Sequence, residues 1–270
     1  MAMKSTNLTI NTLKRMFKEG KRFDDRKLDE YRKIEVSYDV SNKAEGSARV
    51  KIGKTEVIVG IKLAPGTPYP DSLDKGNLMV SGDLLPLASP RFESGPPGFA
   101  AIELPRLIDR AIRESHIIEL DKLVIKEGEK VWTVFIDIYP LNDDGNLIDA
   151  ACIGATAALK KAKIPELNEN GTADYEKKAK KELPISEGIE PLSISFFKLG
   201  DSIIMDPTRE EEEACEARIT FGLSKWKKQY MINSCQKSKE ATFSSAEIEK
   251  MMEMLPKKFD HLNEKLKKFF

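Results

Sequence analysis

Residues 131–165 read VWTVFIDIYPLNDDGNLIDAACIGATAALKKAKIP. The apolar run at 131–139 is typical of a buried strand, and the polar residues 142–145 are typical of a turn. The small residues that follow predict a helix over 147–161, which ends before Pro165. Because a turn that leads from a strand into a helix presents free backbone amides, this arrangement predicts an anion-binding scaffold.

The side chains at the start of this helix do not suit phosphate. An enzyme that handles phosphate is expected to place a basic or hydroxyl residue there. This chain has Leu147, Ile148 and Asp149 instead. The scaffold of an anion site is therefore present, while the side chains that would grip the anion are absent.

Composition and charge limit the classes of function. The 270 residues suffice for one large domain or two small ones. Basic and acidic residues balance at 44 each, so any nucleic-acid role must come from a local patch. The three cysteines are odd in number and have no CxxC spacing. They argue against a disulfide framework or a zinc site, and we expect no metal or other cofactor.

Missing signals exclude several further classes. No apolar run approaches the ~20 residues of a membrane span, and the first residues lack the apolar core of a signal peptide. We therefore expect a cytoplasmic chain with no membrane partner. The chain has no GxSxG, Walker A or GxGxxG motif. Of its two histidines, we expect His116 to be structural and His261 to face solvent.

The predicted elements divide the chain into four parts. These are residues 1–30, a helical extension; 31–165, a first β/α half; 166–190, a polar linker or exposed loop; and 191–270, a second half. In the extension, Asn11 is expected to cap a helix that Gly20 ends. Alternating apolar segments predict strands at 34–40, 48–52, 56–63, 123–125, 131–139, 216–223 and 229–234.

Helix signals complete the fold prediction. Apolar periodicity predicts a helix over 100–115, and Pro105 places its start near Ile102 because proline is best tolerated in the first turn. A capping box that begins at Ser244 opens a final helix, which Pro256 should kink or divide. Strands outnumber helices and several are joined by hairpins. This favours an α+β fold with helices packed on mixed sheets over a doubly wound parallel sheet.

A similar sequence pattern occurs once in each half, and we call it the internal echo. Residues 51–58 and 198–205 both read as strand, glycine-centred turn and strand. Two homologous halves would explain the echo, and so would the general similarity of hairpins.

Two charged clusters are candidates for chemistry. Four adjacent glutamates, residues 210–213, have the charge to bind a metal, but successive residues point in different directions, so a solvated loop or an interface is favoured. Arg106, Arg110 and Arg113 are spaced by four and three, which places them on one helix face. Such a stripe either forms surface salt bridges or grips a phosphate backbone. Spacing alone favours the salt bridges.

Several motifs resemble the ribonuclease PH superfamily, and the resemblance extends from Arg22 nearly to the end. They are RFDDR at 22–26, EGS at 45–47, ELPRLIDR at 103–110 and DGN at 144–146. Three further motifs are similar to the non-catalytic ring subunit of the archaeal exosome. They are FESGPPG at 92–98, KVWTV at 130–134 and DP at 206–207.

The resemblance implies a duplicated β/α fold related to a ribosomal-protein S5 domain. It also implies a place in a ring of six alternating catalytic and non-catalytic subunits, a trimer of heterodimers. Such rings degrade RNA from the 3′ end, with inorganic phosphate attacking the terminal phosphodiester. The implied partners are the catalytic ribonuclease PH-like subunit, RNA-binding cap proteins and single-stranded RNA.

The chain departs from the active members at five positions. Ala100 stands where an arginine helps to bind phosphate, and Leu147 and Ile148 replace a Thr-Arg or Ser-Arg pair. Glu212 and Arg218 stand where the active members have two spaced aspartates. The resemblance therefore implies a chain that is not itself an enzyme, because phosphorolysis needs these cations and carboxylates.

The resemblance also changes the interpretation of the arginine stripe. Arg106 and Arg110 match two arginines, four apart, that help the non-catalytic subunit to bind RNA near its partner's active site. Arg113 is a neighbour without a firm motif match. Two alternatives stay open: an active phosphate-dependent exoribonuclease that uses Glu212 or other carboxylates, and a purely structural ring subunit without RNA contact.

Overall fold

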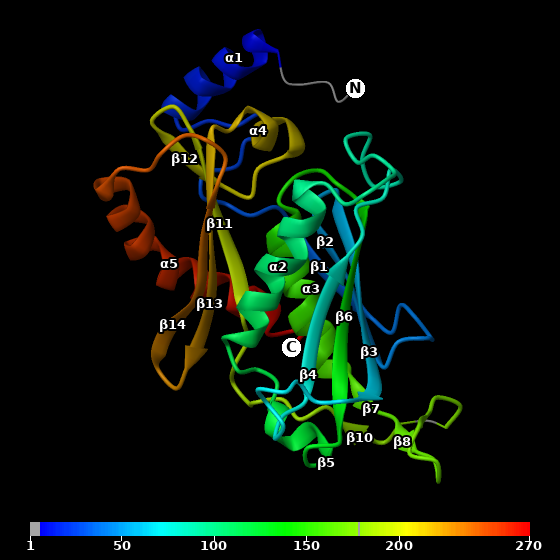
Figure 1. The fold of residues 1–270 in the computed structure, drawn as a ribbon. Helices are drawn as coiled ribbons and strands as arrows, with labels where there is room; N and C mark the ends of the chain where they lie inside the picture. The colour runs from blue at the N-terminus through cyan, green and yellow to red at the C-terminus, as the bar shows by residue number, and fades with distance from the viewer. Residues whose placement is uncertain (1–5, 178) are drawn as a thin grey trace.

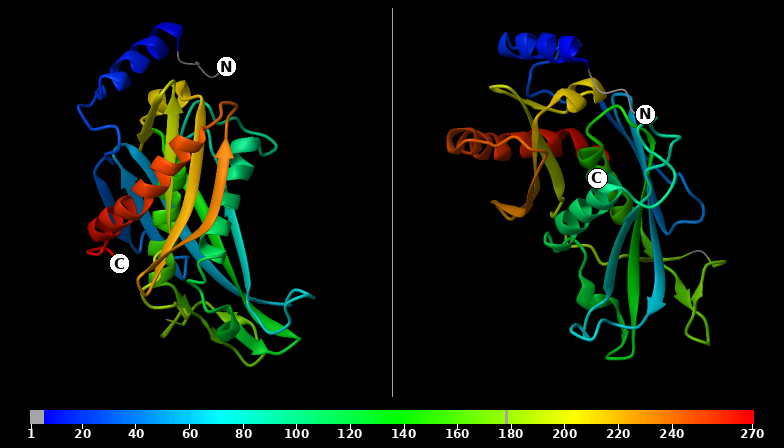
Figure 2. Two further views of the ribbon diagram at one scale, coloured as in Figure 1. Left: turned by 90° about the vertical axis from the view of Figure 1, so that its left-hand side faces the viewer. Right: turned by 45° about the horizontal axis from the view of Figure 1, so that its top comes forward.

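A computed structural model describes residues 6–177 and 179–270 (Figure 1). Two sheets lie on either side of a pair of helices, α2 (Phe99–Arg113) and α3 (Leu147–Lys161), and α5 (Ser245–Leu266) covers the outer face of the second sheet (Figures 1 and 2). The α+β fold with mixed sheets and packed helices that the sequence predicts is confirmed.

The first sheet has the order β1-β2-β3-β6-β4, with β5 paired to β6. Its strands are β1 (Ile34–Tyr38), β2 (Gly46–Ile52), β3 (Thr55–Gly66), β4 (Asn77–Gly82), β5 (Val124–Lys126) and β6 (Lys130–Asn142). All pairs are antiparallel except β4 with β6. The sequence analysis missed β4, because this short strand follows a loop rich in Pro, Gly and Asp and has little apolar alternation.

The second sheet is antiparallel, with the order β12-β11-β13-β14. Its strands are β11 (Leu192–Leu199), β12 (Ser202–Met205), β13 (Ala217–Trp226) and β14 (Gln229–Ser238). The echo noted in the sequence falls on two equivalent hairpins, β2–β3 and β11–β12. Their turn glycines, Gly53 and Gly200, have the same φ of 59°, which favours glycine at both turns.

Helix α3 is the centre of the core, and its small residues let it lie close to the first sheet. Apart from its last two residues, every residue of α3 is buried. A Cβ at Gly154 would come within 2.7 Å of the Val59 side chain. On β2, a Cβ at Gly46 would come within 2.5 Å of the Ala158 carbonyl oxygen. Larger side chains at these positions would force the helix away from the sheet.

Two helix starts differ from the prediction, and the final helix, which opens with the predicted capping box at Ser244, is not divided at its proline. Helix α1 (Asn7–Lys18) is capped by Thr6, whose side chain accepts a hydrogen bond from the Thr9 amide; Asn11 lies inside the helix. Helix α2 begins at Phe99, so Pro105 falls in its second turn. Buried apolar side chains on the inner face of α2 hold the helix across that proline. Helix α5 continues through Pro256 and is not divided there.

The N-terminal helix packs on the second half of the chain. Leu13 and Phe17 are buried against Phe197, Leu199 and Ile204. Short strands occur between the halves: β8 (Glu166–Leu167) pairs β9 (Ala173–Asp174), and β10 (Lys181–Glu182) pairs β7 (Lys163–Ile164). Within the described ranges, no helix is long and apolar enough to cross a membrane.

A buried polar network joins the two halves. Asp206 is fully buried and accepts hydrogen bonds from the backbone amide and guanidinium of Arg32, from Arg26 and from the Asn146 side chain. Nearby, Asp149 at the start of α3 accepts hydrogen bonds from Tyr31, Asn146 and Ser195 of β11. These bonds satisfy carboxylates that would otherwise be costly to bury.

We predict that Asp206→Asn lowers the free energy of unfolding by about 3 kcal/mol, because it removes the buried counter-charge of the Arg32 guanidinium and leaves only the partly exposed Asp144 carboxylate, at 3.2 Å, to pair with it. Asparagine keeps the shape of the side chain and tolerates the left-handed backbone at this position. Urea unfolding measures the change. Asp201→Asn, in the exposed β11–β12 turn, is the matched control and should change the value by less than about 0.5 kcal/mol. Equal losses in the two variants would contradict the role of Asp206.

The pH dependence of stability should report on Asp149. Burial raises the pKa of this carboxyl to about 6 from 3.8. Because the pKa is higher in the folded chain, Asp149 stabilises the fold more at low pH, and this contribution is lost as the pH rises through about 6. Between about pH 5 and about pH 7, the free energy of unfolding of the wild type should fall by about 1 kcal/mol because of Asp149. Asp149→Asn should not show this part of the fall. An unchanged pH profile in urea unfolding would contradict this prediction.

Candidate functional site

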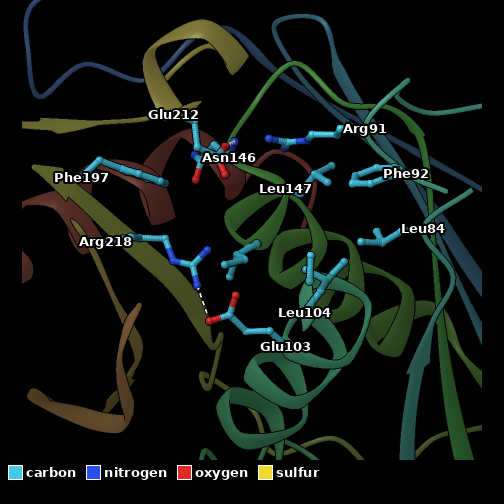
Figure 3. A pocket seen from close by; sticks show the side chains of 12 residues that line it. Leu84, Arg91, Phe92, Glu103, Leu104, Asn146, Leu147, Phe197, Glu212 and Arg218 are labelled. Atoms are coloured by element: carbon cyan, nitrogen blue, oxygen red, sulfur yellow. Dashed lines mark hydrogen bonds and ion pairs between the residues drawn. The ribbon is translucent and has the colours of Figure 1, made fainter. Parts of the chain in front are cut away.

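A cavity of about 220 Å³ lies where the first turns of α2 and α3 meet β13 (Figure 3). All five positions that the sequence resemblance singled out as departures line this one cavity. They are Ala100, Leu147, Ile148, Glu212 and Arg218. The first three contribute apolar surface, so the positions expected to bind phosphate in an active enzyme have no hydrogen-bonding side chain here.

The backbone at the start of α3 keeps the shape of an anion-binding turn. Gly145 has a φ of 85° and packs so tightly on the next half that a Cβ would come within 2.5 Å of the Pro207 carbonyl oxygen. Asn146, with a φ of 59°, is the residue before the helix, but its side chain does not cap it. That side chain donates to Asp149 and Asp206 instead, at 3.1 and 2.9 Å.

Glu212 binds the backbone at the start of α3. One of its carboxylate oxygens accepts a 2.7 Å hydrogen bond from the Asn146 backbone amide. Glu212 comes from α4 (Arg209–Ala214) in the second half, 66 residues away in sequence. A carboxylate at a helix N-terminus satisfies both the free amide and the helix dipole. The protein therefore fills this position with a side chain of its own.

The two cationic side chains of the cavity are paired with carboxylates. Arg218 forms an ion pair with Glu103 at 2.6 Å (Figure 3). Gln236 donates to the same Glu103 carboxylate. Arg91 forms a 2.6 Å ion pair with Asp143. Burial raises the pKa of Asp143, while the Arg91 guanidinium opposes that rise. These pairs leave little positive potential to attract a further anion.

Arg91 was not predicted as a site residue. Its only sequence signal is its position directly before the motif at 92–98. Glu103 and Asn146 belong to motifs that the sequence analysis used for the resemblance, but neither pattern indicates a cavity. Their common location depends on the packing of the two halves against each other.

The glutamate cluster at 210–213, for which we expected a solvated loop or an interface, is helical. Its residues belong to α4, which opens with a capping box between Thr208 and Glu211. Glu211 is buried and pairs with Arg22 through two hydrogen bonds. Among the described residues, no group of three or more potential ligand side chains is placed to hold a metal ion. Long-range pairing orders the cluster, and this pairing is not visible in the local sequence.

The arginine stripe lies on α2, but its three members differ. Arg113 forms an ion pair with Asp109 at 2.6 Å and donates to the Leu78 carbonyl oxygen. Arg106 and Arg110 are exposed, and within residues 6–177 and 179–270 neither has an ion pair or a hydrogen bond from its side chain. The salt-bridge interpretation therefore holds for Arg113 alone. We call the exposed side of α2 that carries Arg106 and Arg110 the arginine face.

Comparisons with known proteins agree on one family. Profiles of the 3′ exoribonuclease family match residues 30–165 as domain 1 and 190–254 as domain 2. Exosome complex component Rrp42 of Methanocella arvoryzae is 44% identical over 248 residues, covering 92% of this chain and 91% of that protein. The Archaeoglobus fulgidus Rrp42 is 46% identical over 208 residues, 77% of each chain.

Solved structures give the same result. A chain of the Archaeoglobus fulgidus exosome with RNA bound to the active site has a TM-score of 0.83 and 40% identity, over 92% of this chain and 93% of that one. A chain of an archaeal exosome core also has a TM-score of 0.83, with 36% identity over 97% of both chains. The chain therefore belongs to the 3′ exoribonuclease, or ribonuclease PH, family, in the group of archaeal exosome Rrp42 components.

Proposed function

We propose that this chain is a non-catalytic subunit of an exosome ring. In this proposal it alternates with a catalytic ribonuclease PH-like partner, three of each, and holds single-stranded RNA beside the partner's active site. The support is its similarity to exosome Rrp42 components and to a chain of an exosome that has RNA in its active site. RNA-binding cap proteins are further proposed partners, on family resemblance alone.

The observation that carries the non-catalytic assignment is the bond from the Asn146 amide to Glu212. In phosphorolysis, positive groups must hold the attacking phosphate and stabilise the charge of the transition state. Here the helix N-terminus is already bound to a carboxylate, and Leu147 and Ile148 supply no donor from their side chains. Loss of one such donor costs on the order of a hundredfold or more in rate, so the loss of several leaves no useful activity.

The arginine face supports the RNA-binding part of the proposal. Arg106 and Arg110 lie one turn apart, about 6 Å along the helix axis. Both guanidiniums are exposed and without a carboxylate partner in the described structure. Arg113 remains a secondary contact, because an i,i+4 ion pair such as that with Asp109 is worth only a few tenths of a kcal/mol and phosphate can displace it. Such contacts bind RNA with little sequence preference.

We predict that Arg106→Ala with Arg110→Ala weakens the binding of single-stranded RNA by the assembled ring about tenfold or more. The salt dependence of log Kd should also fall in slope by about 1.4, because two phosphate contacts are lost. Fluorescence anisotropy in phosphate-free buffer measures both quantities. Arg15→Ala with Lys18→Ala, on exposed positions of α1, removes the same charge and should leave both unchanged. Unaltered affinity in the α2 variant would favour a purely structural subunit.

The purified chain, incubated with RNA and inorganic phosphate, should release no nucleoside diphosphates, because its cavity lacks the phosphate-binding side chains. Chromatography of the products measures the release. In a ring with the catalytic partner, Glu212→Gln should leave the rate unchanged. Phosphate-dependent release by the chain alone that disappears in Glu212→Gln would establish the alternative, an active exoribonuclease.

A further inference from the structure

We infer that the arginine face extends to Phe99, and that Phe99 stacks on a base of the RNA whose phosphates Arg106 and Arg110 bind. This inference rests on the proposed RNA-binding function and names a further contact within it. It is carried by the position and exposure of Phe99 on the same helix.

Helix geometry places these side chains on one face. At 100° per residue, Phe99, Ile102, Arg106 and Arg110 fall within about 80° of one another around α2. Phe99 lies about 10 Å along the axis from Arg106. The apolar side chains are at the N-terminal end of the face and the guanidiniums at its C-terminal end. An extended RNA strand that runs along α2 towards its N-terminus would contact the two guanidiniums first and the Phe99 ring next.

The high exposure of the Phe99 side chain indicates a binding surface. Its side chain is 71% exposed and that of Ile102 is 49% exposed, whereas the opposite face of α2 is buried in the core. Both residues line an open groove of about 860 Å³, whose other wall includes the Gly-Pro-Pro-Gly loop at 95–98. Exposed apolar surface of this kind marks a binding site more often than a random surface does.

Charge decides which ligand fits. A protein surface packed on Phe99 would also cover the guanidiniums beside it, and it would need carboxylates to compensate their loss of water. Single-stranded RNA supplies both requirements from one chain, since each nucleotide offers a phosphate to an arginine and a flat base to an aromatic ring. The two kinds of side chain on one helix face therefore fit single-stranded RNA better than an apolar protein partner.

The test compares Phe99→Ala and Phe99→Tyr in the assembled ring, with a single-stranded oligoadenylate as the probe in phosphate-free buffer. Phe99→Ala should bind about fivefold to a hundredfold more weakly, because a stacked base is lost. Its salt slope should equal that of the wild type, because no phosphate contact is lost. Phe99→Tyr keeps a flat ring and should bind as the wild type does. With 2-aminopurine in the probe, stacking on Phe99 should quench emission in the wild type and not in Phe99→Ala.

Trp226→Ala is the matched control, since Trp226 is a partly exposed aromatic residue beside Lys227 at the end of β13 and does not line the groove that holds Phe99. It should leave affinity and quenching unchanged. Wild-type affinity in Phe99→Ala would overturn the inference and, if Arg106→Ala with Arg110→Ala still weakened binding, would leave the proposed function intact. An equal loss in Trp226→Ala would also overturn it. Dissociation of the Phe99→Ala ring in a mass measurement would assign Phe99 to a subunit contact, and so would exclude the stacking role.

Discussion

The structure depends on one buried carboxylate, that of Asp206. It accepts hydrogen bonds from Arg32, in the segment that leads into the first sheet, and from Asn146 at the start of α3. Asp206 itself ends the β11–β12 hairpin of the second half. A fully buried charge must have its partners in place, so these bonds hold the two halves in one relative position. The cavity between the halves, and the approach of Glu212 to the Asn146 amide, follow from that position.

The same junction explains how the family's scaffold is kept while the side chains at the start of α3 are apolar. The turn before α3 keeps its left-handed backbone at Gly145 and Asn146, which preserves the packing against the second half. Glu212 accepts the Asn146 amide at the helix N-terminus, and the side chains of Leu147 and Ile148 bring no donor to the cavity. Ion pairs of Arg91 and Arg218 neutralise the remaining charge. The charged groups of the cavity therefore pair with one another, whereas Arg106 and Arg110, which have no such partner among the described residues, lie outside the cavity on α2.

The sequence-based predictions succeeded where the interacting residues lie close together in sequence and failed where they lie far apart. The strand, turn and helix at 131–165 and the hairpin at Gly53 were predicted because their signals lie within a few residues. Strand β4 was missed because its pairing with β6 is long-range and its own pattern is weak. The helix at 209–214 was not predicted for a related reason: the partners of Glu211 and Glu212 are Arg22 and the Asn146 amide, distant in sequence.

The sequence by itself determined the local elements, the absence of phosphate-binding side chains at the start of α3, and the spacing that puts Arg106 and Arg110 on one helix face. These are properties of backbone period and side-chain type, which neighbouring residues specify. Only the tertiary structure decided that Arg113 is paired, while Arg106 and Arg110 have no partner in the part of the chain that the structure describes. It alone brought Ala100, Glu212 and the start of α3 to one cavity. Those outcomes depend on contacts between segments that share no local signal, so packing of the whole chain had to specify them.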